Sequence, residues 1–371
     1  MDRTAVLIAA ASGRALAASA RRGGFVPLVA DFFIDQDTVA VAHACRRLES
    51  GLRTGMQARE VLDALNALAD GRHPVGIVCG TGFEDRTGLL AQMAERWPLI
   101  GNAPEVVARV KDPLALAALC REGGIPHPDV SLRRPVDARG WLEKRHGGAG
   151  GRHVHAAFHG DGTDGTYFQR RVSGAPVSAL ILASHGRALL LGFSAQWAAP
   201  APQAPFRYGG AVTPAPITAE TADILAGMIQ RLAAAVPLAG LNSVDFLVAG
   251  DALWLLEINP RPGATLDMFE PDRDSLFRLH VEAWRGTLPA RVAPRRGAAA
   301  SAIVYADHDV PFVPALDWPD WAADRPHAGI AMKAGEPLCT VTATAVTAGQ
   351  AKRLVGCRIE TILARMYEKV A

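Results

Sequence analysis

The 371-residue sequence lacks the features of a membrane or secreted protein. No apolar run reaches the roughly 20 residues that a transmembrane helix needs. The apolar start, Met1–Ala11, lacks the basic region and the long apolar region of a signal peptide. The five cysteines are odd in number and widely spaced, with no C-x-x-C pair, which favours reduced buried thiols over disulfides or zinc. We therefore expect a soluble, cytoplasmic protein with no membrane partner.

An excess of charge of one sign is also missing. The formal net charge is +2, which gives no indication of a nucleic-acid partner. Hydrophobic residues make up 49% and charged residues 20% of the chain, which are ordinary values for a globular protein. The length favours two or three domains with ample core, and the chain has no internal repeats.

The most informative stretch is GLNSVDFLVAGDALWLLEINPRPGATLDM, residues 240–268. It predicts two apolar strands, Ser243–Ala249 and Leu253–Ile258, joined by a turn at Gly250-Asp251. One face of this hairpin is expected to be apolar and to pack on a core. Its expected members are Val244, Phe246, Val248, Trp254, Leu256 and Ile258.

Three polar residues interrupt this hairpin: Asp245, Glu257 and Asn259. A three-residue loop, 250–252, would place Asp245 opposite Glu257, with Asn259 on the same face, whereas a two-residue turn would separate the carboxylates. Two carboxylates and an amide oxygen on one face repel each other unless a cation lies between them, and such ligands suit Mg²⁺ or Mn²⁺ bound with nucleotide phosphates. The alternative is a set of solvated residues at the rim of a hairpin. Arg261, in the turn-rich segment that follows, favours the metal interpretation and can hold a phosphate or carboxylate with two hydrogen bonds.

A second candidate site is a glycine-rich loop that follows the predicted strand Trp141–Arg145. Its glycines are Gly147, Gly148, Gly150 and Gly151. Backbone N–H groups without neighbouring side chains can approach a triphosphate closely, and Lys144 on the strand would supply positive charge. A flexible hairpin loop is the alternative. The histidines at 146, 153, 155 and 159 are an alternative candidate for zinc binding, although no further ligand is predicted nearby.

The N-terminal segment predicts an α/β domain. A strand, a helix and a second strand within Ala5–Ala30 form a Rossmann-type βαβ opening, although the chain has no G-x-G-x-x-G fingerprint. A helix is expected over Val39–Glu49 and a strand over Val75–Cys79. The loop of residues 80–85 follows that strand, where open α/β sheets bind ligands, so it is either a ligand loop or a helix-capping turn.

Taken together, these motifs resemble the ATP-grasp superfamily, whose ligases carry Asp…Glu-x-Asn on their last two strands as ligands of Mg²⁺-ATP. The resemblance implies an α/β fold with α+β subdomains. Its expected parts are a Rossmann-like N-terminal domain (1–107), an ATP-grasp domain (108–290) with a lid at about 125–195, and a small β-rich C-terminal extension (291–371).

The same resemblance extends to residues expected to bind ATP. Val110-Lys111-Asp112-Pro113, before a helix and Gly-Gly-Ile-Pro, resembles an Asp-Lys pair at the entry to the domain, with Lys111 displaced to the other side of the aspartate. The segment Tyr167–Pro176 resembles the hinge that faces adenine. It implies nucleotide contacts at Gln169, Arg170 and Val172, with Gln169 replacing the usual acid. Lys144 and Arg261 are the expected catalytic residues.

Within the superfamily the chain is most similar to the tyramine–glutamate ligase group of methanofuran-type cofactor synthesis. The motifs are V-x-G-A-P-x-S, F-R-Y-G-G, N-S-V-D-F and E-I-N-P-R-P-G. This implies an ATP-dependent ligase that joins a carboxylate, with L-glutamate as a candidate, to an amine such as tyramine through an acyl phosphate. A homodimer is a further expectation. The alternatives are an ATP-grasp carboxylase and a non-catalytic nucleotide-binding regulator.

Overall fold

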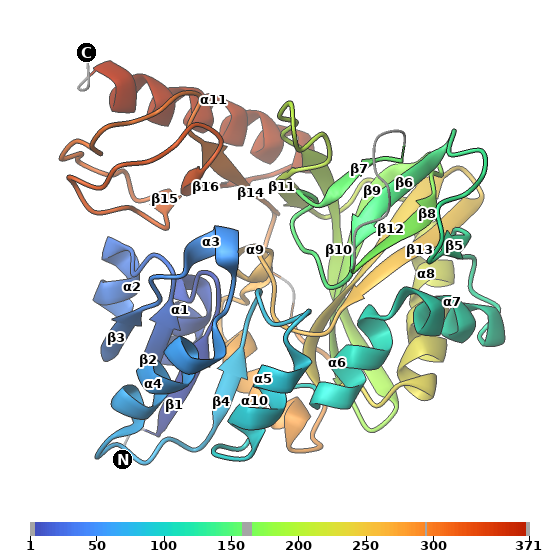
Figure 1. Ribbon diagram of the computed structural model, residues 1–371, viewed down its shortest axis with the longest axis horizontal. Helices are drawn as coiled ribbons and strands as arrows, with labels where there is room; N and C mark the ends of the chain where they lie inside the picture. Colours follow the sequence, from blue (N-terminus) through green and yellow to red (C-terminus); the bar gives the residue numbers. More distant parts are fainter. Residues whose placement is uncertain (1–3, 158–164, 294, 369–371) are drawn as a thin grey trace.

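The computed structural model describes residues 4–157, 165–293 and 295–368. Figure 1 shows an N-terminal part (blue), a central part (green to yellow) and a C-terminal part (orange to red) that lies above the N-terminal part. Within the described ranges, no helix is both long enough and apolar enough to cross a membrane.

The N-terminal part is a four-stranded parallel sheet in the order β3-β2-β1-β4. Its strands are β1 (Ala5–Ala9), β2 (Val26–Asp31), β3 (Ala44–Arg47) and β4 (Ile77–Cys79). Its helices are α1 (Arg14–Arg22), α2 (Gln36–Val41), α3 (Gly51–Thr54), α4 (Ala58–Ala69) and α5 (Thr87–Ala94). Leu7 and Ile8 point to opposite faces of β1 and are both fully buried, as expected of a parallel sheet that is covered on both sides.

The expected helix over Val39–Glu49 is wrong. Helix α2 ends at Val41, and residues 44–47 form β3, which pairs in parallel with β2 from Leu28 to Asp31. Helix and strand propensities differ by less than about 1 kcal/mol per residue, so the backbone hydrogen bonds that extend the sheet decide the conformation.

The central part contains an eight-stranded sheet in the order β13-β12-β9-β10-β11-β14-β16-β15. Its first five strands are β9 (Ala175–Ser184), β10 (Arg187–Ala198), β11 (Tyr208–Thr213), β12 (Gly240–Ala249) and β13 (Ala252–Asn259). Helix α8 (Ala219–Ala235) packs on one face through Leu225, Ile229 and Leu232. The other face packs on the N-terminal part and on α10 (Leu276–Trp284).

A separate four-stranded antiparallel sheet, in the order β5-β8-β6-β7, lies beside the large sheet. Its strands are β5 (Val130–Ser131), β6 (Trp141–Arg145), β7 (Val154–Ala156) and β8 (Thr166–Arg170). It is preceded by α6 (Pro104–Lys111) and α7 (Pro113–Glu122). The part of the expected lid range 125–195 that follows Arg170 contains β9 and β10, which belong to the large sheet.

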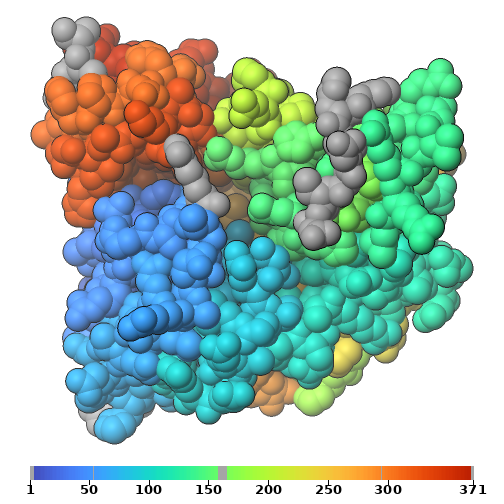
Figure 2. Space-filling model, viewed as in Figure 1, coloured from blue at the N-terminus to red at the C-terminus, as the bar shows by residue number. Residues whose placement is uncertain are grey.

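The C-terminal part continues the large sheet. Its elements are β14 (Ala298–Tyr305), β15 (Ala322–Ala323), β16 (Pro337–Ala345) and α11 (Ala348–Glu368), and the short α9 (Leu266–Phe269) precedes them. Strand β14 pairs with β11 from Gly210 to Thr213. In Figure 2 the orange C-terminal part rests directly on the blue N-terminal part.

The contact between these two parts includes a buried ion cluster. The Arg14 guanidinium lies 2.5 Å from Asp267 and 3.0 Å from Asp324, while the Asp37 carboxylate accepts hydrogen bonds from the backbone N–H groups of Asp324 and Arg325. The cluster therefore joins the N-terminal sheet, the segment after β13 and the C-terminal part.

Candidate active site

The β12–β13 hairpin brings Asp245 opposite Glu257, as expected, but by a different route. The turn contains two residues, because Ala249 pairs with Ala252, and a β-bulge at Leu256 then restores the register. A bulge inserts one extra residue into one strand and so reverses the facing of the residues on either side of it. The expected pairing is confirmed and the expected three-residue loop is wrong.

The bulge also changes which side chains face the core. Leu253 and Leu255 are buried there with Val244, Phe246 and Ile258. The expectation that Trp254 and Leu256 pack on this core is therefore wrong. Leu256 instead lines a pocket on the polar face, beside Glu257.

On that polar face, the Asn259 side-chain amide nitrogen donates to both carboxylates. It lies 2.9 Å from Asp245 Oδ2 and 3.3 Å from Glu257 Oε1. The other Asp245 oxygen, Oδ1, is buried without a hydrogen-bond partner among the described residues. Burial and the Glu257 charge raise the pKa of Asp245, as expected for two carboxylates that share one site. The partly positive Asn259 N–H group thus lies between two carboxylates, where a cation could lie instead. Because Asp245 Oδ1 also lacks a partner among the described residues, this set of oxygen donors fits a hard divalent cation.

Two lysines from different elements converge on these acids. Lys111 Nζ lies 2.8 Å from Asn259 Oδ1 and 3.4 Å from Glu257 Oε2. Burial by itself would raise the pKa of Glu257, but the charges of Lys111 and Lys144 lower it below its usual value. Desolvation lowers the pKa of Lys144, which contacts Gln169 Oε1 at 2.7 Å. Glu257 is therefore held ionised by positive charge that an anionic ligand can share.

Local chain chemistry explains how Lys111 reaches the site. Asp112 is the N-cap of α7, where its carboxylate accepts from the Ala115 N–H at 2.7 Å, and Pro113 occupies the first helical position. Proline disfavours the helical conformation in the residue before it, which is Asp112 here. Helix α6 therefore ends at Lys111, and α7 begins along a new axis. Lys111 is then on the last turn of α6, which packs against β13.

The glycine-rich loop is in close contact with two other segments. A Cβ atom at Gly147 would lie 2.7 Å from the backbone nitrogen of Asp85, and one at Gly151 would collide with the carbonyl oxygen of Phe206. Both glycines have positive φ, 63° and 70°, which other residues rarely adopt. Gly148 packs directly against the His153 ring. The loop thus spans from the N-terminal part to the segment before β11.

The hinge residues lie at the end of β8. Gln169 is buried, and the Arg170 N–H donates to the Asp129 carbonyl at 2.8 Å. Among the described residues, the backbone N–H of Val172 has no hydrogen-bond partner. Beside these residues is a pocket between the two sheets. It is lined by Lys111, Leu116, His127, Gly147, Gly148, His153, Tyr167, Gln169, Leu256 and Glu257, with others from α6 and α7.

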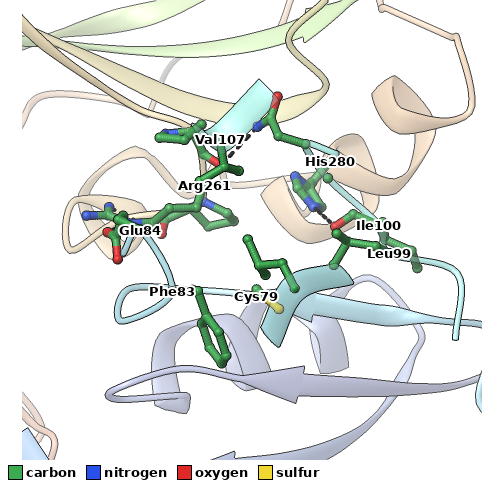
Figure 3. Close-up of a pocket in the computed structure, with 14 residues that line it drawn as sticks. Cys79, Phe83, Glu84, Leu99, Ile100, Val107, Arg261 and His280 are labelled. Carbon is green, nitrogen blue, oxygen red and sulfur yellow. Dashed lines mark hydrogen bonds and ion pairs between the residues drawn. The ribbon is translucent and has the colours of Figure 1, made fainter. Parts of the chain in front are cut away.

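A second pocket separates the N-terminal part from the β13 end (Figure 3). At one end, Arg261 Nε contacts Glu84 Oε1 at 2.7 Å, and Glu84 Oε2 accepts from the Gly82 N–H at 2.7 Å. Burial opposes ionisation of Glu84, but Arg261 and Lys111 lower its pKa below the usual value. His280 lies at the other end. Apolar side chains, including Phe83, Leu99 and Val107, form much of the wall between them.

The structure therefore brings the three expected acid and amide side chains together with Lys111, and one pocket beside them is lined by Lys111, Gly147, Gly148, Gln169 and Glu257. Lys144 contacts Gln169, whereas Arg261 pairs with Glu84 in the other pocket. Glu84 was identified in the sequence only as part of loop 80–85, and its pairing with Arg261 is a contact between distant segments that no local pattern predicts. No sequence pattern indicated that His127 would line the pocket between the two sheets. Of the four histidines, His146 and His155 do not line the pocket between the two sheets, His153 lines it, and His159 lies outside the described residues.

Comparison with known proteins agrees with this geometry. Residues 111–265 match an ATP-grasp domain family. Over 95 residues the chain is 35% identical to formate-dependent phosphoribosylglycinamide formyltransferase of Oleidesulfovibrio alaskensis, covering 25% of this chain and 24% of that protein. The same enzyme of Acinetobacter baumannii is 33% identical over 97 residues, or 26% of this chain and 24% of that protein. The chain thus spans about a quarter of the length of these curated relatives.

Two solved structures share the arrangement over most of the chain. The biotin carboxylase domain of Hydrogenobacter thermophilus 2-oxoglutarate carboxylase, a dimer with MgADP, ADP and bicarbonate, has a TM-score of 0.73 at 13% identity, covering 94% of this chain and 88% of that one. N5-carboxyaminoimidazole synthase from Aspergillus clavatus, with ADP and an aminoimidazole ribonucleotide, has a TM-score of 0.69 at 14% identity, covering 98% and 99%. At these identities the likeness shows a common fold.

Proposed function

We propose that this chain, in which residues 111–265 match an ATP-grasp domain family, uses ATP to join a carboxylate to an amine. The observation that carries the proposal is the convergence of Asp245, Glu257 and Asn259 with Lys111 and Lys144 beside a glycine-rich loop. Fixed positive charge, a site for a cation and exposed backbone N–H groups are what a nucleotide triphosphate requires.

The chemistry follows from the weakness of a carboxylate as an electrophile. Its oxygen attacks the γ-phosphorus of ATP, which forms an acyl phosphate and releases ADP. The amine then attacks the acyl carbon, phosphate leaves, and the amine loses a proton as the amide forms. Phosphoryl transfer of this kind depends on positioning and charge neutralisation more than on a protein nucleophile.

Each group of residues has a role in this scheme. Lys111 and Lys144 neutralise phosphate charge, and the backbone of the loop Gly147–Gly151 closes over the phosphates. The hinge residues Gln169, Arg170 and Val172 accommodate the adenine, where the Val172 N–H, which has no partner among the described residues, can donate to the base. Arg261, held by Glu84, is placed to bind the carboxylate or the acyl phosphate.

Asp245, Glu257 and Asn259 are the residues that would hold Mg²⁺. When bound, the ion neutralises negative charge on the phosphates. The unpartnered Asp245 Oδ1 and the shared position between the acids support this assignment.

For the substrates we propose L-glutamate and tyramine as the first pair to test, since the motifs at 172–178, 206–210, 242–246 and 257–263 resemble the tyramine–glutamate ligase group. The related proteins named above act with formate or bind bicarbonate, so these small acids are the matched alternatives. A carboxylase would release phosphate with bicarbonate alone.

The test measures phosphate release from Mg²⁺-ATP with a matrix of acids and amines, including bicarbonate and formate. We expect release that requires both an acid and an amine, and Glu257→Ala is expected to lower it at least about 100-fold. Glu220→Ala, on the exposed face of α8, is the matched control and is expected to be as active as the wild type.

Tight Mg²⁺-ATP binding without release for any pair would favour a nucleotide-binding regulator. Release that depends on bicarbonate alone would favour a carboxylase. A fully active Glu257→Ala protein would contradict the metal assignment.

A further inference from the structure

One buried polar group on the cleft face of the large sheet has no role in the scheme above. The hydroxyl oxygen of Tyr208, the first residue of β11, is shielded from solvent and has no hydrogen-bond partner among the residues that the structure describes. A phenol without a partner in such a position loses about 1–3 kcal/mol relative to water. An unpaired buried donor of this kind indicates a ligand that completes it.

The Tyr208 backbone and ring are held on three sides, so the hydroxyl is fixed in position. Its N–H donates to the Gly150 carbonyl in the glycine-rich loop at 2.9 Å. Its carbonyl accepts from the Tyr305 hydroxyl at 2.8 Å. The ring packs in a small apolar cluster with Met268 and Phe269. Among the described residues, the hydroxyl group has no hydrogen-bond partner.

The strand register places Tyr208 on the same face as the metal-binding acids. Asp245 pairs with Ser178, and Ser178 pairs with Ser194, so these three form a row across β12, β9 and β10 on one face. Ala198 lies on the same face as Ser194, four residues further along β10, and it pairs with Tyr208 after an irregularity at Gly209. Across the sheet, Glu257 therefore lies on one side of Asp245, and Tyr208 lies on the other side of it on the same face.

The electrostatics agree with this placement. Burial and then the Asp245 charge raise the pKa of Tyr208 above its usual value. A phenol is protonated at neutral pH even without such a shift, so the group is available as a hydrogen-bond donor. Asp245 Oδ1, on the same face, is also without a hydrogen-bond partner among the described residues. Two polar groups without partners among the described residues thus lie on one face of the sheet, and one of them belongs to a residue whose backbone is bonded to the glycine-rich loop.

We propose that Tyr208 is a catalytic residue whose hydroxyl donates a hydrogen bond to an oxygen of the phosphoryl group as it moves from ATP to the acid. The inference rests on the proposed function, because it needs a phosphoryl group beside Asp245. The phenol keeps its proton, and no bond to it forms or breaks. A neutral donor adds little to the binding of ground-state ATP, whose phosphates are already neutralised by Lys111 and Lys144. Its effect is greatest when charge on the transferring oxygens is redistributed.

The position of Tyr208 also depends on the glycine-rich loop. Since the loop carbonyl of Gly150 accepts from the Tyr208 N–H, the hydroxyl is held in place when the loop is docked. The loop and the reacting oxygen are thereby coupled through one residue.

The test uses Tyr208→Phe, which removes the hydroxyl and keeps the ring and both backbone hydrogen bonds. Tyr367→Phe is the matched control. It removes a hydroxyl that accepts from the Asp307 N–H on the C-terminal part, away from the cleft. We expect Tyr208→Phe to lower kcat about 100-fold and to change the KM for ATP by less than about threefold, while Tyr367→Phe retains wild-type kinetics.

A second measurement does not need the substrates to be known. Binding of MgADP alone and of MgADP with aluminium fluoride, which imitates a transferring phosphoryl group, is compared by calorimetry. Tyr208→Phe is expected to bind MgADP like the wild type and to lose at least about tenfold in affinity for the aluminium fluoride complex. Equal affinity of both proteins for that complex would overturn the role of Tyr208. If the wild-type protein binds MgADP but shows no turnover that depends on an acid and an amine, the ligase proposal is overturned. The comparison of the two proteins with aluminium fluoride would still decide the role of Tyr208.

Discussion

His280 should make the stability of this protein sensitive to mild acid. Its ring is 1% exposed on α10, where Nδ1 accepts from the Leu241 N–H at 2.8 Å and Nε2 lies 3.0 Å from the Ile100 carbonyl. Because Nδ1 accepts, the proton must be on Nε2, and the ring is neutral. Gly240 and Gly101 leave the space that the ring fills. A second proton on Nδ1 would replace the Leu241 hydrogen bond with two opposed donors.

The size of the effect follows from the pKa of the ring. Burial lowers the pKa of His280 from 6.5 to about 4. Between these values the unfolded chain binds more protons than the folded protein, so the free energy of unfolding falls as the pH is lowered. The contribution is complete above about pH 6.5 and is lost as the pH approaches 4. Between about pH 7.5 and about pH 5 the loss is about 2 kcal/mol.

The assay compares urea unfolding of the wild type and His280→Gln at both pH values, followed by circular dichroism. Glutamine cannot titrate, so its unfolding free energy should fall by about 2 kcal/mol less than that of the wild type over the same pH interval. Other buried groups, such as Glu270, titrate in both proteins and cancel in this difference. A pH-dependent loss that is the same in both proteins would refute the assignment of a buried neutral ring.

Two further substitutions test contacts between parts of the chain. Arg14→Met leaves Asp267 and its neighbouring carboxylates without their cation, so it should lower the free energy of unfolding by about 3 kcal/mol. Urea unfolding measures this change, and an unchanged value would contradict a structural role for this cluster. Gly151→Ala should displace the glycine-rich loop, since its Cβ would collide with the Phe206 carbonyl, and should lower kcat/KM for ATP at least about tenfold. Gly150→Ala is the control, because Gly150 has a similar positive φ of 67° with no atom near its Cβ position, and equal losses in both variants would mean that backbone conformation alone matters.

The sequence was sufficient to predict which acids meet in the hairpin. Asp245, Glu257 and Asn259 interrupt apolar strands, and a requirement that they share a face fixes their pairing. It was not sufficient to predict the bulge, because a two-residue turn with a bulge and a three-residue loop produce the same pairing near the acids. The two solutions differ in which way residues 252–256 face, and these residues are all apolar, so the sequence pattern there does not distinguish the solutions.

Contacts between distant segments could not be predicted from the sequence, for a related reason. The Arg261–Glu84 pair, the Arg14 cluster and the two hydrogen bonds of His280 join residues that are far apart in the chain. Single charged residues of this kind have the same local pattern as solvated surface residues. Their roles depend on how the N-terminal and central parts pack, which local periodicity does not encode.

The order in which the large sheet is completed matters for synthesis on the ribosome. Strand β11 carries Tyr208, yet its outer edge is covered only by β14, which emerges after the whole β12–β13 hairpin and α10. Until then a nascent chain presents the open backbone edge of residues 208–213, a surface on which another strand can add. Truncation before Ala298 would make that edge permanent and would remove the Tyr305 hydroxyl from the Tyr208 carbonyl. The last strands are thus a part of the sheet that carries the site, and shortened chains should aggregate and lose activity together.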